Sequence, residues 1–197
     1  MRTVKLVLPY LLIAAGAVLV YQGARVYLQS KLGQTEAQRQ FVEHSSGEPA
    51  ETESGVAAPP QDGEAIAKLT IPRLDTELYV VEGDDDKDLR LGPGHLPGTA
   101  MPGADGNCVI AGHRDTHFRV LKDLKKGDEI ILETSHGDFR YRVEDTRVVP
   151  PTNTKPLLPT SDAELHLITC YPFYYIGSAP KRFVVQAELE GKAPGPS

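Results

Sequence analysis

Three segments of this 197-residue sequence place a reactive side chain at the end of a strongly apolar run. They read NCVIAGHRDTHF from residue 107, LHLITCYPF from residue 165 and APKRFVV from residue 179. The apolar letters predict buried strands, and a rigid strand presents the polar residue at its end to a groove. The residues presented in this way are His113, Cys170 and Arg182.

A cysteine, a histidine and an arginine together suit acyl transfer by a thiol. Cys170 would attack an acyl carbon as the thiolate, and His113 would protonate the departing amine. Arg182 is permanently charged and multidentate, so it would hold the peptide carbonyl and stabilise the developing oxyanion. Each residue taken alone has an ordinary structural explanation: a buried Cys, a surface His and an Arg at the start of a strand. Their joint occurrence favours catalysis.

Three neighbours are candidates for positioning this group. Thr169 precedes Cys170 and is placed to hydrogen-bond Arg182 or substrate, while Asp115 and His117 follow His113 and would orient its imidazole or line the groove. A turn-capping Asp and a surface His explain Asp115 and His117 equally well.

No cofactor is predicted. The remaining histidines show no cysteine or carboxylate cluster at the spacing of zinc ligands; they are His44, His95, His136 and His166. The acidic run EGDDDKD at residues 82–88 lacks the ordered ligand spacing of a calcium loop. We expect a solvated loop or a helix start there, and calcium dependence stays open.

The elements that must position these residues are mainly strands. With 16 Pro, 18 Gly and no Trp, the chain favours turns and short strands over long helices, which indicates an all-β fold. Short apolar or alternating runs predict an antiparallel or mixed barrel over residues 66–190, with a short helix at 117–124. The expected strands are 66–71, 78–81, 107–111, 129–134, 139–149, 165–170 and 183–189.

The N-terminal region predicts a membrane anchor followed by a tether. Residues 6–24 carry no charge, and nineteen helical residues span roughly 28 Å, the thickness of the bilayer core. A cleaved signal peptide is the alternative, but the run is long for one and lacks a clear cleavage site. Residues 25–65 read as a flexible acidic tether that begins with a helical extension, and 191–197 as a disordered tail. The charges that flank this run are nearly balanced, so charge alone does not settle its orientation in the membrane.

The charge of the chain excludes one class of partner. A net charge of -6 and a pI near 5.5 supply no clustered basic surface for phosphate binding, so nucleic acid is not expected as a partner.

The motifs GHRDTHF and LITCYPFYYIGSAPKRFVV resemble those of the sortases, and of class D sortases in particular. The resemblance extends to IPRL at residue 71, GPGHLPGTA at residue 92 and KKGDEI at residue 125. It implies a closed eight-stranded barrel and the roles argued above for His113, Cys170 and Arg182. It also implies the orientation of the anchor, with residues 1–5 in the cytoplasm and the catalytic head outside it. The implied reaction cleaves a C-terminal LPxTG-like sorting signal of a secreted protein through a thioester. The acyl group then passes to an amine of a cell-wall peptide or of a protein lysine.

Two details refine this interpretation. No aromatic lid motif of the kind found in pilin-polymerising sortases precedes the barrel, which argues against pilus assembly.

Cys108 lies five residues before His113 on an extended strand, roughly 16 Å away along the backbone. We therefore expect Cys108 to be a buried strand residue and not a disulfide partner of Cys170.

Other functions compete with this one. A thiol peptidase or an L,D-transpeptidase-like cross-linker also uses Cys and His, but the SHG at residues 135–137 is followed by Asp138 where the latter needs Cys. A catalytically silent, anchored binding module is the alternative from another class.

Overall fold

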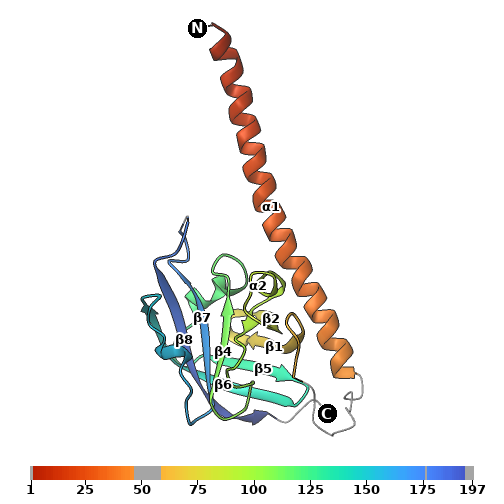
Figure 1. Ribbon diagram of the computed structural model, residues 1–197, viewed down its shortest axis with the longest axis vertical. Helices are drawn as coiled ribbons and strands as arrows, with labels where there is room; N and C mark the ends of the chain where they lie inside the picture. The colour runs from red at the N-terminus through yellow and green to blue at the C-terminus, as the bar shows by residue number, and fades with distance from the viewer. Residues whose placement is uncertain (1, 47–58, 176, 194–197) are drawn as a thin grey trace.

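The computed structural model describes residues 2–46, 59–175 and 177–193. Eight strands form a closed barrel in the order β1-β2-β3-β4-β7-β8-β6-β5 (Figure 1). The strands are β1 (Ala65–Ile71), β2 (Thr76–Glu82), β3 (Gly94–His95), β4 (Asn107–Gly112), β5 (Glu129–Thr134), β6 (Gly137–Val149), β7 (Glu164–Tyr171) and β8 (Lys181–Ala193). The helices are α1 (Arg2–Ser46), α2 (Asp88–Leu91) and the 3-10 turns η1 (Pro72–Leu74), η2 (His117–Asp123) and η3 (Lys155–Leu157). The predicted all-β, eight-stranded barrel with short helices is confirmed.

Alternating apolar residues close the barrel around one core. In β1, Ala67, Leu69 and Ile71 are fully buried and the residues between them are partly exposed. A side-chain period of two turns every second residue inward. The same alternation in β5 contributes Ile130 and Leu132, so the two neighbouring strands fill one interior.

The strands differ from the predicted ones mainly at their ends. β3 was not predicted, because its two residues lie in a Gly- and Pro-rich stretch that is typical of a turn. β2 begins at Thr76 instead of Leu78. β8 continues into the predicted tail, because Ala193 pairs with Asp138 of β6. Residues 194–197 of that tail lie outside the described part of the chain.

Helix α1 corrects the predicted tether. It runs without a break to Ser46, so residues 33–46 are helical and not a flexible linker. Ala37 is 2% exposed, and Phe41 packs against Tyr79 with ring centroids 5.8 Å apart. Side chains four residues apart share one helix face, and docking of this face on the barrel offsets the ordering entropy. Residues 47–58 of the predicted tether lie outside the described residues.

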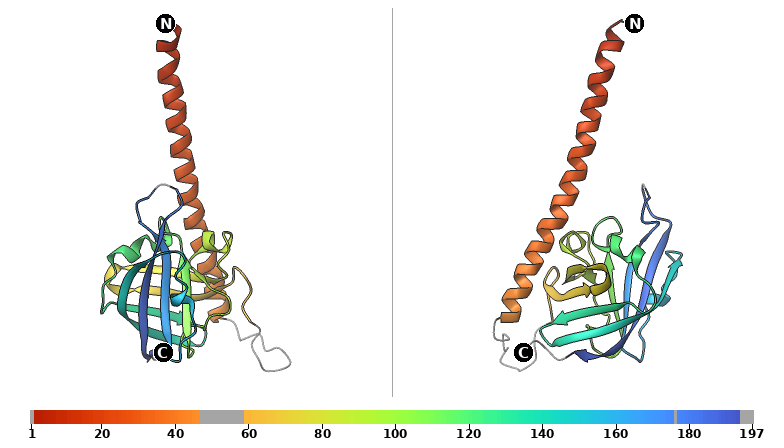
Figure 2. Two further views of the ribbon diagram at one scale, coloured as in Figure 1. Left: turned by 60° about the vertical axis from the view of Figure 1, so that its left-hand side comes forward. Right: turned by 180° about the vertical axis from the view of Figure 1, so that it is seen from behind.

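The two halves of α1 have different surroundings (Figure 2). The C-terminal half lies beside the barrel near β1, β2 and α2, while the N-terminal half projects away from it. Within the residues that the structure describes, no helix is both long enough and apolar enough to cross a membrane. The anchor predicted at residues 6–24 stays a prediction.

The acidic run at residues 82–88 is less solvated than expected. Asp88 begins α2, as a helix start there requires, but it is only 2% exposed, and burial raises the pKa of its carboxyl group. Glu82 is 8% exposed and accepts a 2.7 Å hydrogen bond from Nδ1 of the buried His95. This pair joins the end of β2 to β3.

Candidate active site

The strand order brings the three predicted catalytic residues to one end of the barrel. β4 and β7 lie parallel with Gly112 opposite Thr169, so the next residues, His113 and Cys170, follow side by side. β7 and β8 lie antiparallel with Cys170 directly opposite Arg182. Directly paired residues on neighbouring strands point to the same face of a sheet. Cys170 therefore lies between His113 and Arg182 in one row.

The alternation along β7 shows which face carries this row. Leu165 and Leu167 pack in the barrel core, while His166 and Ile168 alternate with them and point the other way. Cys170 has the same parity as His166 and Ile168, so its thiol belongs to the outer face of the barrel. This is where a substrate reaches a strand without entering the core.

The floor next to the catalytic row is apolar. Ala111, Ile168 and Val184 are paired across β4, β7 and β8, one step along the outer face from Cys170. Val184 is only 1% exposed although it points away from the barrel core. Burial on this side indicates that other residues cover the face, and the loop 150–163 between β6 and β7 is bonded to the same face at Asn107.

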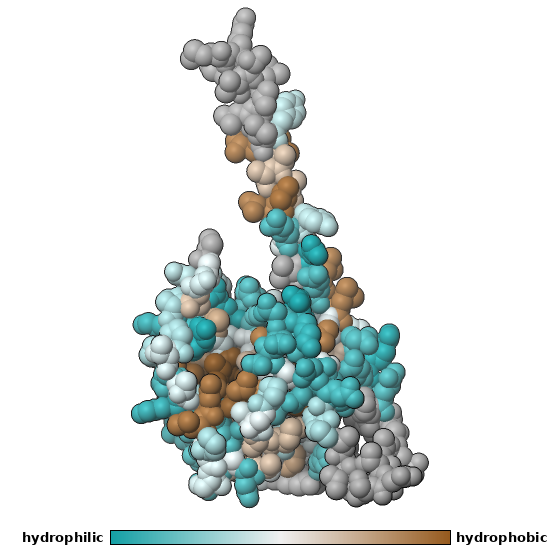
Figure 3. Space-filling model, in the orientation of Figure 1, coloured by the Kyte–Doolittle hydropathy of each residue, from teal (hydrophilic) through white to brown (hydrophobic). Residues whose placement is uncertain are grey.

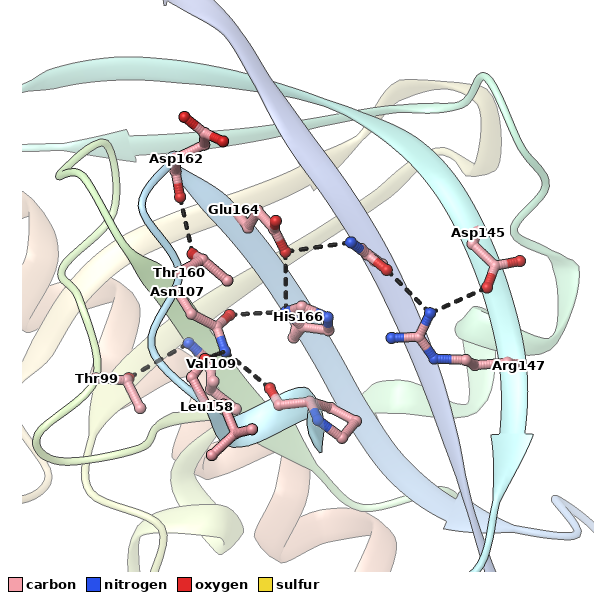
Figure 4. Close-up of polar contacts among 12 residues, drawn as sticks. Thr99, Asn107, Val109, Asp145, Arg147, Leu158, Thr160, Asp162, Glu164 and His166 are labelled. Carbon is pink, nitrogen blue, oxygen red and sulfur yellow. Dashed lines mark hydrogen bonds and ion pairs between the residues drawn. The ribbon is translucent and has the colours of Figure 1, made fainter. Parts of the chain in front are cut away.

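Asn107 fastens this loop over the outer face (Figure 4). Its Nδ2 donates to the carbonyl oxygens of Pro156 at 2.8 Å and Leu158 at 3.0 Å. The loop starts after Val149, which pairs with Arg182, and therefore leaves the sheet beside the catalytic row. The loop and the outer face of β4, β7 and β8 thus lie next to the strand end that carries Cys170.

His166 supports Asn107 from the same face. Because the amide nitrogen of Asn107 donates to the loop, its Oδ1 is the acceptor of the 2.7 Å bond from His166 Nδ1. Burial, and next the charge of Arg147, lower the pKa of His166 to about 4, so the ring is neutral near pH 7. Gln186 links Arg147 to Glu164, whose carboxylate lies 4.0 Å from His166 (Figure 4).

The two cysteines have different environments. Cys108 is 1% exposed in the core, and burial raises the pKa of its thiol, which makes it a poor nucleophile. Cys170 is half-buried at the surface end of β7. Both are free thiols, and Cys108 pairs with Leu165, five residues before Cys170. The prediction that Cys108 is a buried, unbridged strand residue is confirmed.

The guanidinium of Arg182 contacts the backbone at the start of β8. Its Nη1 donates to the carbonyl oxygens of Lys181 at 3.1 Å and Ala179 at 3.5 Å. Among the described residues, no hydrogen bond joins the side chains of His113, Cys170 and Arg182 directly. Catalytic hydrogen bonds often form only when substrate is bound.

The three candidate positioning residues have different places. The hydroxyl of Thr169 donates to the Gly112 carbonyl at 2.6 Å, not to Arg182, and so ties the end of β4 to β7. Asp115 is exposed. His117 is not a surface histidine: it is 6% exposed, and its Nε2 lies 3.4 Å from Ser30 Oγ of α1.

Arg114 was missed by the sequence analysis, although it directly follows His113. Its Nη2 donates to the carbonyl oxygens of Tyr175 at 3.0 Å and Gly177 at 2.9 Å, and its guanidinium lies over the Tyr175 ring. Arg114 therefore braces the loop that joins Cys170 to Arg182. No sequence signal marks it, because its partners are backbone carbonyls about sixty residues away.

Apolar surface is concentrated in two places (Figure 3). One is an apolar patch on the barrel, and the other follows α1. The exposed large apolar side chains of the barrel and its loops include Val148, Leu157 and Leu158, at the end of β6 and on the loop 150–163. Apolar residues beside a polar site are typical of a peptide-binding surface.

Comparison with known proteins assigns the family. The family model of the sortase domain matches residues 69–190, which include the barrel strands and all three predicted catalytic residues. The chain belongs to the sortase family. Sortases are cysteine transpeptidases, so this enzyme requires an accessible thiol.

Several sortases are similar over most of their length. Sortase D of Bacillus subtilis is 36% identical over 193 residues, covering 92% of this chain and 96% of that protein. The structure of a Clostridium perfringens Sortase D5 transpeptidase matches with a TM-score of 0.70 at 27% identity, over 81% of this chain and 99% of that one. The catalytic domain of Bacillus anthracis SrtD matches with a TM-score of 0.59 at 32% identity, over 72% and 98%. The predicted resemblance to class D sortases is confirmed.

The sortase assignment also distinguishes the two cysteines as candidate nucleophiles. A transpeptidase thiol must meet a peptide carbonyl, and buried Cys108 has no access to one. Cys170 lies on the outer face at the end of β7, next to a histidine and an arginine in register. The silent binding module considered from the sequence is therefore disfavoured.

Proposed function

We propose that this sortase cleaves a C-terminal LPxTG-like sorting signal through a thioester on Cys170 and transfers the acyl group to an amine. The observation that carries the proposal is the row His113, Cys170, Arg182 on three adjacent strands, with the half-buried thiol in the middle. The apolar outer face formed by Ala111, Ile168 and Val184 beside this row suits the leucine and proline of such a signal.

In the first step the sulfur of Cys170 attacks the carbonyl carbon of the scissile bond. A sulfur–carbon bond forms, and the carbonyl oxygen becomes an oxyanion that Arg182 stabilises. The carbon–nitrogen bond then breaks, and His113 gives its proton to the leaving amine. The product is a thioester on Cys170 and a free C-terminal fragment.

In the second step an acceptor amine attacks the thioester carbon. His113 takes the proton of the amine, the new amide bond forms, and the thiolate of Cys170 leaves. The same three residues thus serve both halves of the reaction. The acceptor is an amine of a cell-wall peptide or of a protein lysine, and attack by water instead would make the enzyme a simple thiol peptidase.

Two further parts of the proposal concern the surroundings of the enzyme. The uncharged run at residues 6–24 anchors the chain in the membrane with the barrel outside the cytoplasm. Resistance to alkaline extraction and cleavage of the barrel by protease added outside the cell test this. The reaction needs no cofactor, and retention of full activity in a chelator such as EDTA tests independence from calcium.

The central test uses the full chain in detergent micelles with an LPxTG peptide and a short amine, read by mass spectrometry. Wild type yields the cleaved and the amine-joined products. Cys170→Ala abolishes both, while Cys108→Ala, the same change at a buried thiol, leaves them intact. Cleavage that survives in Cys170→Ala rules the mechanism out.

The partner residues are tested in the same assay. His113→Ala is expected to lose about two to four orders of magnitude in kcat/KM, as removal of a general acid does. Arg182→Lys keeps the charge but loses the planar fork, and about a hundredfold loss is expected. His136→Ala and Arg140→Lys, at exposed positions, are the matched controls.

A further inference from the structure

One polar side chain of α1 bonds both the edge of β2 and the end of α2. β3 pairs with β2 only at Val81 and Glu82, so the backbone of Tyr79 lies beyond its reach. Gln34 of α1 fills this place: its Oε1 accepts from the Tyr79 amide at 2.8 Å, and its Nε2 donates to the Tyr79 carbonyl at 3.0 Å. The same Nε2 donates to the Leu91 carbonyl at the end of α2 at 2.9 Å. One amide thus fixes α1 to two elements.

Gly33 allows the backbones to approach this closely. A Cβ on Gly33 would lie 2.7 Å from the Arg90 carbonyl oxygen and 2.7 Å from the Leu91 Cα. Both are backbone atoms of α2, which cannot move aside like a flexible side chain. Beside this contact, a groove of about 590 Å³ lined by residues of α1 and α2 leaves part of the seam open. The docking therefore depends on a few close contacts.

The same region reaches the loop that carries His113. His117 is buried, its Nε2 lies 3.4 Å from Ser30 Oγ of α1, and the backbone of Arg90 in α2 is close enough to act on its pKa. The loop is closed on itself, because the Phe118 amide donates to the His113 carbonyl at 3.0 Å. His117 is thus the point at which α1, α2 and the loop 113–118 meet.

The electrostatics of His117 suit a positioning role. Burial, and next the charge of His113, lower its pKa to about 4, so its ring is neutral near pH 7. The backbone of Arg90 and the negative charge of Asp115 raise the pKa of His117 in part, while the positive charge of Lys31 in α1 lowers it further. A neutral His117 does not repel a protonated His113.

We propose that docked α1 holds the His113 loop in its catalytic position, with His117 as the positioning residue that links helix and loop. This inference rests on the proposed function only for its kinetic readout, because the coupling itself is measurable without turnover. A segment expected to be a passive tether is then part of the catalytic domain. A misplacement of about 1 Å in a catalytic group lowers rates by about a hundredfold.

The test compares Gly33→Ala with Gly23→Ala in the full chain in detergent micelles. Both changes improve the helix propensity of α1, but a Cβ on Gly23 meets nothing within 4 Å. Hydrogen exchange of the Tyr79 amide reports docking, exchange of the Phe118 amide reports the loop, and peptide transfer reports kcat and KM. Gln34→Ala is a second undocking variant.

We expect Gly33→Ala to raise exchange at both amides and to lower kcat at least tenfold with KM changed less than twofold. Gly23→Ala should match wild type. His117→Ala should lower kcat to a similar extent, and His117→Gln should recover part of that loss. The kcat of the double variant Gly33→Ala with His117→Ala should be no lower than that of either single variant, because both changes break the same link.

Two results overturn the proposal. One is faster exchange at Tyr79 with unchanged exchange at Phe118 and unchanged kcat, which would make α1 a passive support. The other is unchanged Tyr79 exchange in both Gly33→Ala and Gln34→Ala, which would mean that these contacts do not hold the helix. If wild type transfers no peptide, the proposed function fails, while the exchange at Phe118 still tests the coupling.

Discussion

Acid is expected to destabilise this barrel through the buried His166. Its Nδ1–H is committed to Asn107, so a second proton must go to Nε2 inside a largely buried site. Burial and the charge of Arg147 lower its pKa, and Glu164 at 4.0 Å is the nearby opposite charge. In the unfolded chain the ring is in water and takes the proton freely.

The magnitude follows from proton linkage. The pKa of His166 is lowered from 6.5 to about 4, so the unfolded chain binds more protons than the folded chain between these values. The stabilisation is fully present above pH 6.5 and is lost as pH falls toward 4. At pH 5 the loss relative to pH 8 is about 2 kcal/mol. His117, whose pKa is also lowered to about 4, adds a loss of about the same size.

The assay is urea unfolding of the full chain in mild detergent between pH 5 and pH 8, followed by the near-ultraviolet circular dichroism of its tyrosines. His166→Asn keeps a donor for Asn107 but does not titrate, so we expect it to lose about 2 kcal/mol less than wild type over this range. His136→Asn, at an exposed turn, should follow wild type. An identical pH dependence in His166→Asn and wild type would refute the reasoning.

Three other substitutions test the framework of the site. Asn107→Ala removes the donor to two loop carbonyls and should lower the free energy of unfolding, measured in urea, by about 3 kcal/mol. The KM for peptide should rise, and an unchanged KM would show that the loop does not shape the peptide site. Gly103→Ala introduces a Cβ 2.0 Å from the Phe139 ring at a φ of +80° and should lower the melting temperature strongly. The control is Gly98→Ala, which has a similar φ of +84° but open space around the added Cβ, so it bears only the backbone strain. Equal losses of melting temperature would contradict the packing argument. Arg114→Ala frees the loop before β8 and should raise KM severalfold in peptide titrations, and an unaltered KM would argue against bracing.

The sequence predicted the barrel and its reactive row for one physical reason. Each of the three segments has a polar or reactive side chain at one end of an apolar strand. Because such a group is unfavourable in an apolar core, that end of the strand must lie at the surface. NCVIAG is apolar at nearly every position, because Cys108 and Ile110 face the core while Val109 and Ala111 lie on the outer face, where Val109 is also buried. Such two-sided burial is typical of a central strand.

The residues that were missed act through partners that a sequence does not reveal. Asn107 and Gln34 bond backbone carbonyls on loops and strands far along the chain. Residues 33–46 have the composition of a tether, and only the barrel surface that receives Gly33 and Ala37 makes them part of the fold. The two-residue β3 is too short for any periodicity to appear.

The three side chains that the sequence did not reveal all lie around the row of His113, Cys170 and Arg182. Asn107 fixes the loop over the outer face, Arg114 fixes the loop between Cys170 and Arg182, and Gln34 fixes the helix behind His117. Each of the three uses a side chain to bond backbone carbonyls of a segment that lies around the row. The barrel strands set the spacing of the proposed nucleophile, acid and oxyanion partner through their register. The three side chains, which act as clamps, position the segments around that row. Substitutions of core residues in the strands should therefore act mainly on stability, whereas substitutions in the clamps should also change kcat and KM.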